Sequence, residues 1–117
     1  MSAADIAADQ LKCLRALSVI LADGALTMPE SWHMHTHTAY DPPIAPTLEG
    51  LFLDDPRNPP TVKELRELLD AYAERYGLAV EEKPHGEAGK VGLHTVGKWQ
   101  GVELHVWGPA LPEGGAS

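Results

Sequence analysis

Apolar residues recur at three- and four-residue steps near the start of the chain, the spacing that gathers side chains on one face of a helix. This pattern predicts a first helix over Ala4 to Asp23, and Gly24 supplies a stop. The polar residues Asp9, Lys12, Arg15 and Ser18 fall on its other side. The predicted apolar stripe consists of Ile6, Gln10, Cys13, Leu14, Leu17, Ile20 and Leu21.

A second helix is predicted over Thr61 to Tyr76. Thr61 and Glu64 have the spacing of a capping box, in which each side chain satisfies a free backbone donor of the other residue. Gly77 ends the helix. The expected apolar stripe contains Val62, Leu65, Leu68, Leu69, Tyr72, Ala73 and Tyr76.

Between the helices the period changes to two, which is typical of a strand with two different faces. Trp32, Met34, Thr36 and Thr38 alternate there with His33, His35 and His37. Leu48 to Leu53 is the expected partner strand, and Leu78 to Lys83 is a further short strand. Six prolines predict loops, because proline cannot donate to a central ladder: Pro42, Pro43, Pro46, Pro56, Pro59 and Pro60.

Residues Val91 to Trp107 are expected to form a hairpin that turns at Gln100-Gly101. This register places the pairs Trp99/Val102, Gly97/Leu104 and Thr95/Val106 on one face. The opposite face then carries the pairs His94/Trp107, Val96/His105 and Lys98/Glu103.

The predicted element order is α-β-β-α-β-β-β. An antiparallel sheet with both helices on one face would bury every apolar stripe named above, so we predict a two-layer α+β sandwich. Residues 1–107 are expected to form one domain, and residues 108–117 a flexible C-terminal tail.

The amino-acid composition argues against several classes of partner and site. The 117 residues include nine basic and seventeen acidic ones, a formal net charge of −8, which argues against nucleic acid as the main partner. The single cysteine, Cys13, excludes an intramolecular disulfide and a Cys-rich zinc site, and its place on the first helix predicts a buried, inert thiol.

The first ten residues have no basic cluster of the signal-peptide type, and no apolar run is long enough for a membrane span. We therefore expect a cytoplasmic protein with no membrane contact.

The predicted fold leaves one face of the sheet open, and that face concentrates the chemistry. It would carry five of the six histidines together with Glu103 and Trp107. Aromatic and amphipathic side chains anchor protein interfaces, so this face predicts a protein partner or self-association. The residues expected to make the contact are His33, His35, His37, His105 and Trp107.

A plain solvated sheet face is one alternative, because histidine is tolerated on a half-exposed strand. A divalent transition-metal site is the other, because neutral imidazoles are good ligands. Same-face residues on a strand lie about 6.5–7 Å apart, so one ion could take His33 with His35, or His35 with His37. The expected third ligand comes from across the sheet, with His105, His94 and Glu103 as candidates. The set His33, His35 and His105 would support a metal-dependent hydrolase; otherwise we assign no cofactor and no catalytic residue.

Two resemblances bear on these hypotheses. The run from His33 to Tyr40 (HMHTHTAY) resembles the first metal motif of the polymerase-and-histidinol-phosphatase phosphoesterases, which implies metal-assisted phosphoester hydrolysis with His33 and His35 as ligands. That likeness covers eight residues, and the strand–helix repetition and later ligand motifs of the family do not follow.

The overall layout, closing on the hairpin from Val96 to Gly108, is similar to small uncharacterised proteins of actinobacterial phages and mobile elements. This likeness implies an accessory protein. From the sequence we therefore predict a small, non-enzymatic, phage- or mobile-element-encoded binding protein, with the metal-dependent hydrolase as the alternative and homodimerisation through the sheet as a third interpretation.

Overall fold

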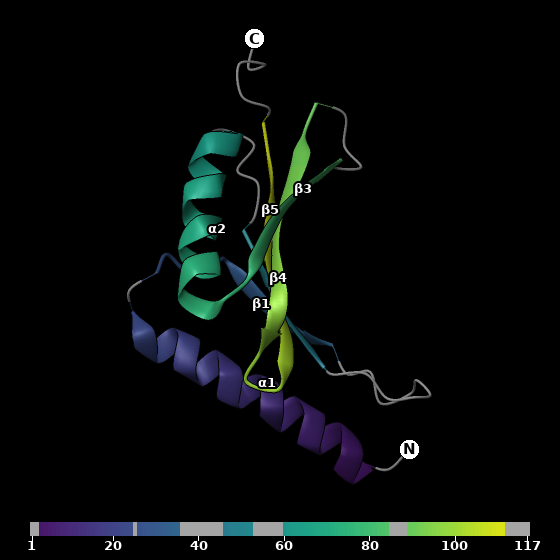
Figure 1. Cartoon of the computed structure of the whole chain (residues 1–117). Coiled ribbons are helices and arrows are strands. Elements are labelled where there is room, and N and C mark those ends of the chain that lie inside the picture. Colours follow the sequence, from purple (N-terminus) through teal and green to yellow (C-terminus); the bar gives the residue numbers. More distant parts are fainter. Residues whose placement is uncertain (1–2, 25, 36–45, 53–59, 85–88, 112–117) are drawn as a thin grey trace.

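The computed structural model describes residues 3–24, 26–35, 46–52, 60–84 and 89–111. Within these ranges it contains two helices and a five-stranded sheet in the order β1-β2-β5-β4-β3. In Figure 1, α2 lies beside β3, β4 and β5, and α1 crosses below it. The elements are α1 (Ala3–Asp23), β1 (Ser31–His35), β2 (Thr47–Leu51), α2 (Val62–Tyr76), β3 (Ala79–Pro84), β4 (Val91–Trp99) and β5 (Val102–Ala110).

The predicted fold class is confirmed: the element order is α-β-β-α-β-β-β, and both helices pack against the sheet. One pairing differs from the fully antiparallel sheet that we expected, because β2 and β5 run parallel. The reason is the crossover through α2, which returns the chain so that β3 runs in the direction of β2. The β3-β4-β5 meander then ends with β5 in that same direction beside β2.

The register predicted for the β4–β5 hairpin is confirmed. Trp99 pairs with Val102, and Gly97 pairs with Leu104. The turn residues Gln100 and Gly101 both have positive φ, 54° and 78°, as the favoured two-residue hairpin turn requires.

The end of the sheet lies further along the chain than expected. β5 continues past Trp107 to Ala110, and Gly108, Pro109 and Ala110 are buried. The Leu111 amide donates to the Pro60 carbonyl at 2.9 Å, which holds this end against the start of α2. Residues 108–111 are therefore part of the folded unit, because they have backbone partners that the sequence pattern did not indicate; residues 112–117 lie outside the described residues.

The core lies between the helices and one face of the sheet. Leu48 and Leu104 from the sheet are fully buried, as are Leu69 and Tyr72 from α2 and Cys13 from α1. The predicted buried thiol is thus confirmed, and burial, followed by the nearby Asp9 charge, raises its pKa. In the described part of the chain, no helix is long and apolar enough to span a membrane.

The face that α1 buries differs from the prediction. Asp9 and Ile20 are buried, whereas Leu14 and Leu21, both expected in the core, are 50% and 53% exposed. The small residues Cys13 and Ala16 lie on the buried side, where they allow close approach to the sheet. Cys13 and Ile20 of the predicted stripe are buried and Leu17 packs against the core, so the prediction is confirmed for these three residues and wrong for Leu14 and Leu21.

Candidate interaction face

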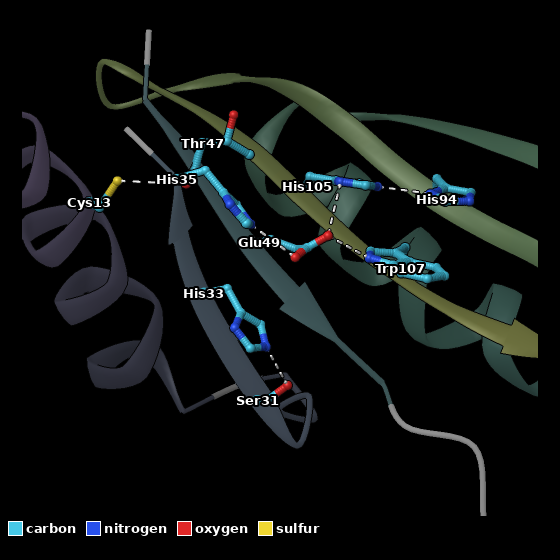
Figure 2. Close-up of polar contacts among 9 residues, drawn as sticks. All are labelled: Cys13, Ser31, His33, His35, Thr47, Glu49, His94, His105 and Trp107. Atoms are coloured by element: carbon cyan, nitrogen blue, oxygen red, sulfur yellow. Dashed lines mark hydrogen bonds and ion pairs between the residues drawn. The ribbon is translucent and has the colours of Figure 1, made fainter. Parts of the chain in front are cut away.

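Strand alternation and register bring the predicted site residues to one open face of the sheet. His33 pairs with Glu49 on β2, and Glu49 pairs in turn with His105 on β5. His94 and Trp107 form the next cross-strand pair on this face. We call this surface the histidine face and define it by the side chains of His33, His35, Glu49, His94, His105 and Trp107 (Figure 2).

Glu49 is the hub of this face. The Trp107 indole donates a hydrogen bond from Nε1 to Glu49 Oε2 at 2.9 Å. His35 Nε2 lies 3.2 Å from Glu49 Oε1, and His105 Nδ1 lies 3.9 Å from Oε2. Figure 2 shows these three side chains converging on the carboxylate from the two strands that flank β2. One side chain on β2 therefore contacts residues of both β1 and β5.

A second contact extends the cluster to β4. His94 Nδ1 and His105 Nε2 lie 2.8 Å apart, and the His94 ring stacks on Trp107 with centroids 4.9 Å apart and planes at 6°. The 2.8 Å distance is that of a hydrogen bond between the two rings, in which the tautomers of His94 and His105 decide which nitrogen donates.

The two ionisable groups at the centre have opposite charge preferences. Burial opposes ionisation of Glu49, but hydrogen bonds from His35 and Trp107 outweigh it, so the pKa of Glu49 is lowered. Burial lowers the pKa of His105, more than the Glu49 charge raises it. The centre therefore favours an ionised Glu49 beside a neutral His105.

His33 lies at the margin of the face. It is exposed, its ring stacks on His35 with centroids 6.5 Å apart, and its Nε2 lies 3.2 Å from the Ser31 hydroxyl. The structure thus brings together His35, His105 and Trp107 around Glu49, with His33 beside them. His37, the remaining predicted contact residue, lies outside the described residues.

Glu49 was missed in the sequence analysis. Its signal was the strand alternation, since Leu48 and Gly50 point to the helices and Glu49 must point away. Its role depended on β2 lying between β1 and β5, which alternation alone does not give. Glu103, a candidate third metal ligand, is exposed and pairs in register with Thr47 and Lys98.

The described residues contain no group of three or more His, Cys, Asp or Glu side chains arranged to hold a metal ion. The arrangement closest to the predicted ligand set is His35 and His105 on the two oxygens of Glu49. The metal set His33, His35 and His105 stays a prediction.

A hollow on the other layer is lined by residues of both helices and of β4. There the Asp23 carboxylate is held by Arg75 and by the Tyr76 hydroxyl, the latter at 3.0 Å. These contacts join the end of α1 to the end of α2. We therefore assign Asp23, Arg75 and Tyr76 to the packing of the two helices. The lining residues are Val19, Ala22, Asp23, Arg75, Tyr76 and Trp99.

Comparison of the chain with protein-family models, with curated proteins and with solved structures gave no match. The two resemblances drawn from the sequence therefore stay predictions.

Proposed function

We propose that this chain is a non-enzymatic binding protein that contacts a protein partner through the histidine face. The observation that supports this proposal is the Glu49 hub, which ties side chains of three adjacent strands into one preorganised surface. Side chains already held in place lose less conformational entropy when a partner binds. A phage or mobile-element accessory protein acting in the cytoplasm is the narrower form of the proposal, and it rests on the sequence layout.

The face offers a partner both anchors and hydrogen-bonding groups. His35 is half exposed, while Glu49 and His105 keep 22% and 24% of their side chains accessible. Trp107 and His94 present stacked rings beside them. Large rigid rings with polar edges are the residue types that carry binding energy at the centre of protein interfaces.

Site-specific photo-crosslinking tests this proposal. A photoreactive amino acid is placed at His33 on the face and, as the matched control, at Lys63, which is exposed on α2 in the other layer. Both variants are expressed in the organism that encodes the chain. We expect a discrete crosslinked protein from position 33 and none from position 63. Equal labelling at both positions, or no adduct at position 33, would contradict the proposal.

A divalent metal site is the second candidate function. It is favoured by one specific observation: two imidazole nitrogens, from β1 and β5, lie 3.2 and 3.9 Å from the two oxygens of one carboxylate. Imidazole and carboxylate groups are ligands that zinc accepts in proteins. In that case His35 and His105 would bind the ion together with Glu49, and zinc content would depend on His35.

A further inference from the structure

The side of α1 that faces away from the sheet carries a second, regular pattern. Six positions follow each other at alternating steps of three and four residues, the heptad spacing of helices that pair along a seam. All six are exposed and none is charged. These positions, which we call the α1 seam, are Ala4, Ala7, Leu11, Leu14, Ser18 and Leu21.

The seam gathers apolar surface that the fold leaves uncovered. Leu11, Leu14 and Leu21 are 45%, 50% and 53% exposed. Among the described residues, five large hydrophobic side chains are exposed, and four of these lie on α1. Exposed apolar residues gathered on one element mark an interaction surface, whereas scattered ones do not.

We propose that the α1 seam binds the α1 seam of a second copy of this chain, with the two helices antiparallel. The argument for this occupant is that the seam complements itself. When the helices are aligned about their middle, Leu11 packs against Leu14 of the second copy, and Ala7 lies against Ser18 of the second copy. Ala4 then lies against Leu21 of the second copy, so that small residues face small or large ones and two leucine pairs fill the centre.

The net charge of −8 makes two copies of the chain repel each other, so their contact requires a surface without charged residues. The seam has no charged residue to desolvate, and Gln10 and Arg15 stand at its borders, where polar residues flank a coiled-coil core. Antiparallel alignment also places the positive N-terminal end of each helix dipole beside the negative C-terminal end of the other, whereas parallel alignment would bring like ends together.

The small area of the seam places it among weak, reversible interfaces. A helix of 21 residues is about 31 Å long. Pairing two such helices removes on the order of 1,000 Å² from water in total, the lower limit for a specific interface. We therefore expect a reversible dimer that forms at micromolar or higher concentration. Since α1 packs on the helical layer, both histidine faces stay open, and this inference does not depend on the proposed function.

Sedimentation equilibrium over a wide concentration range tests the proposal. The test variant is Leu14→Glu, which puts a charge at the centre of the seam. The matched control is Val19→Glu, because Val19 is equally exposed, at 48%, on the same helix but off the seam. Neither side chain is in the core, and circular dichroism checks that both variants fold.

We expect the mass of the wild-type chain to rise from 12.6 kDa towards twice that value as concentration increases. Leu14→Glu should shift the dimer dissociation constant upward by at least tenfold, and Val19→Glu should leave it within about twofold. A wild-type chain that stays monomeric throughout overturns the proposal. So does a dimer that survives Leu14→Glu, which would point to another interface, or one that Val19→Glu weakens equally.

The antiparallel alignment has its own readout. In a Cys13→Ala background, Ser18→Cys and Ala7→Cys chains are mixed and oxidised. Antiparallel pairing predicts crosslinks between the two different chains and few between identical Ser18→Cys chains. Predominant Ser18→Cys self-crosslinking would show a parallel pair and overturn the alignment.

Discussion

The Trp107 indole donates a hydrogen bond to the Glu49 carboxylate, 2.9 Å away across the parallel pairing of β2 with β5. This contact spans the junction between the β1–β2 hairpin and the β3-β4-β5 meander, two parts of the sheet that are far apart in sequence. Glu49 binds His35 on the other side, so the same carboxylate both organises the face and fastens the sheet. Changes at Glu49 should therefore affect stability as well as binding.

Replacing Glu49 by Gln is expected to lower the free energy of unfolding at pH 7 by about 1 kcal/mol. The amide keeps one acceptor for Trp107 but presents no charge to His35 and His105. Urea unfolding followed by circular dichroism measures the change. The control is Glu103→Gln, an exposed position on the same face, which should alter stability by less than about 0.5 kcal/mol. Coincident unfolding curves for wild type and Glu49→Gln would contradict the assignment of Glu49 as the hub.

The free energy of unfolding should fall as the solution becomes acidic, and His105 is the first group to cause this loss. Its pKa in the folded chain lies below the ordinary 6.5, so below pH 6.5 the unfolded chain binds a proton that the folded chain does not. The free energy of unfolding therefore falls as pH drops from 6.5 towards the folded pKa. Glu49, with a pKa lowered from 4.5, adds a second loss in the same direction at lower pH, as its carboxylate is protonated.

Thermal unfolding midpoints between pH 8 and pH 4 check this dependence. His105→Gln should flatten the part of the profile between pH 7 and pH 5, whatever its effect on absolute stability. His33→Gln, which changes an exposed histidine on the same face, should keep the wild-type slope. Equal slopes in the wild type and His105→Gln would contradict the lowered pKa. The charged and titratable groups around His105 are Glu49, Lys83, Glu103, His35 and His94, and both variants leave them unchanged.

Gly50 is required by its cross-strand neighbour. A Cβ atom at this position would lie 2.7 Å from Cζ3 of Trp32 and 2.9 Å from Cγ of Pro29. Gly50→Ala should therefore cost about 1–3 kcal/mol through overpacking. A double-mutant cycle with Trp32→Ala should show a smaller cost for Gly50→Ala in the truncated background. Additive effects of the two changes would exclude the contact as the cause.

The N-terminal cap of α2 should make a measurable contribution to the free energy of unfolding. The Thr61 hydroxyl accepts from the Glu64 amide at 3.2 Å and donates to the Glu64 carboxylate at 3.1 Å. Thr61→Ala removes both bonds and should cost about 1 kcal/mol, while Thr61→Ser should keep most of the stability. Urea unfolding of the three chains measures this, and equal losses in both variants would point to the methyl group instead.

Some parts of this structure could be predicted from the sequence, and others could not. The β4–β5 register followed from strict alternation around a two-residue turn, because a one-residue slip would move Val102 and Leu104 out of the core. The Glu49 hub did not follow, because it needs β2 inserted next to β5, and that depends on a crossover rather than on local pattern. On α1, Leu14 and Cys13 satisfy the same helical spacing, and the packing contacts with the sheet decide which of them is buried.

The second candidate function predicts that the chain purified without chelator holds zinc at less than one equivalent, measured by mass spectrometry of metals. Zinc–nitrogen bonds are about 2.0–2.1 Å long, so His35 and His105 would have to move towards an ion that shares Glu49 with them. Glu49 Oε2 is held by Trp107, and binding an ion would compete with that hydrogen bond. Trp107→Phe should therefore raise zinc occupancy, whereas His35→Ala should abolish it. Zinc that persists in His35→Ala, or a metal-free wild-type chain that Trp107→Phe does not load, would remove the metal site and leave the histidine face as a contact surface.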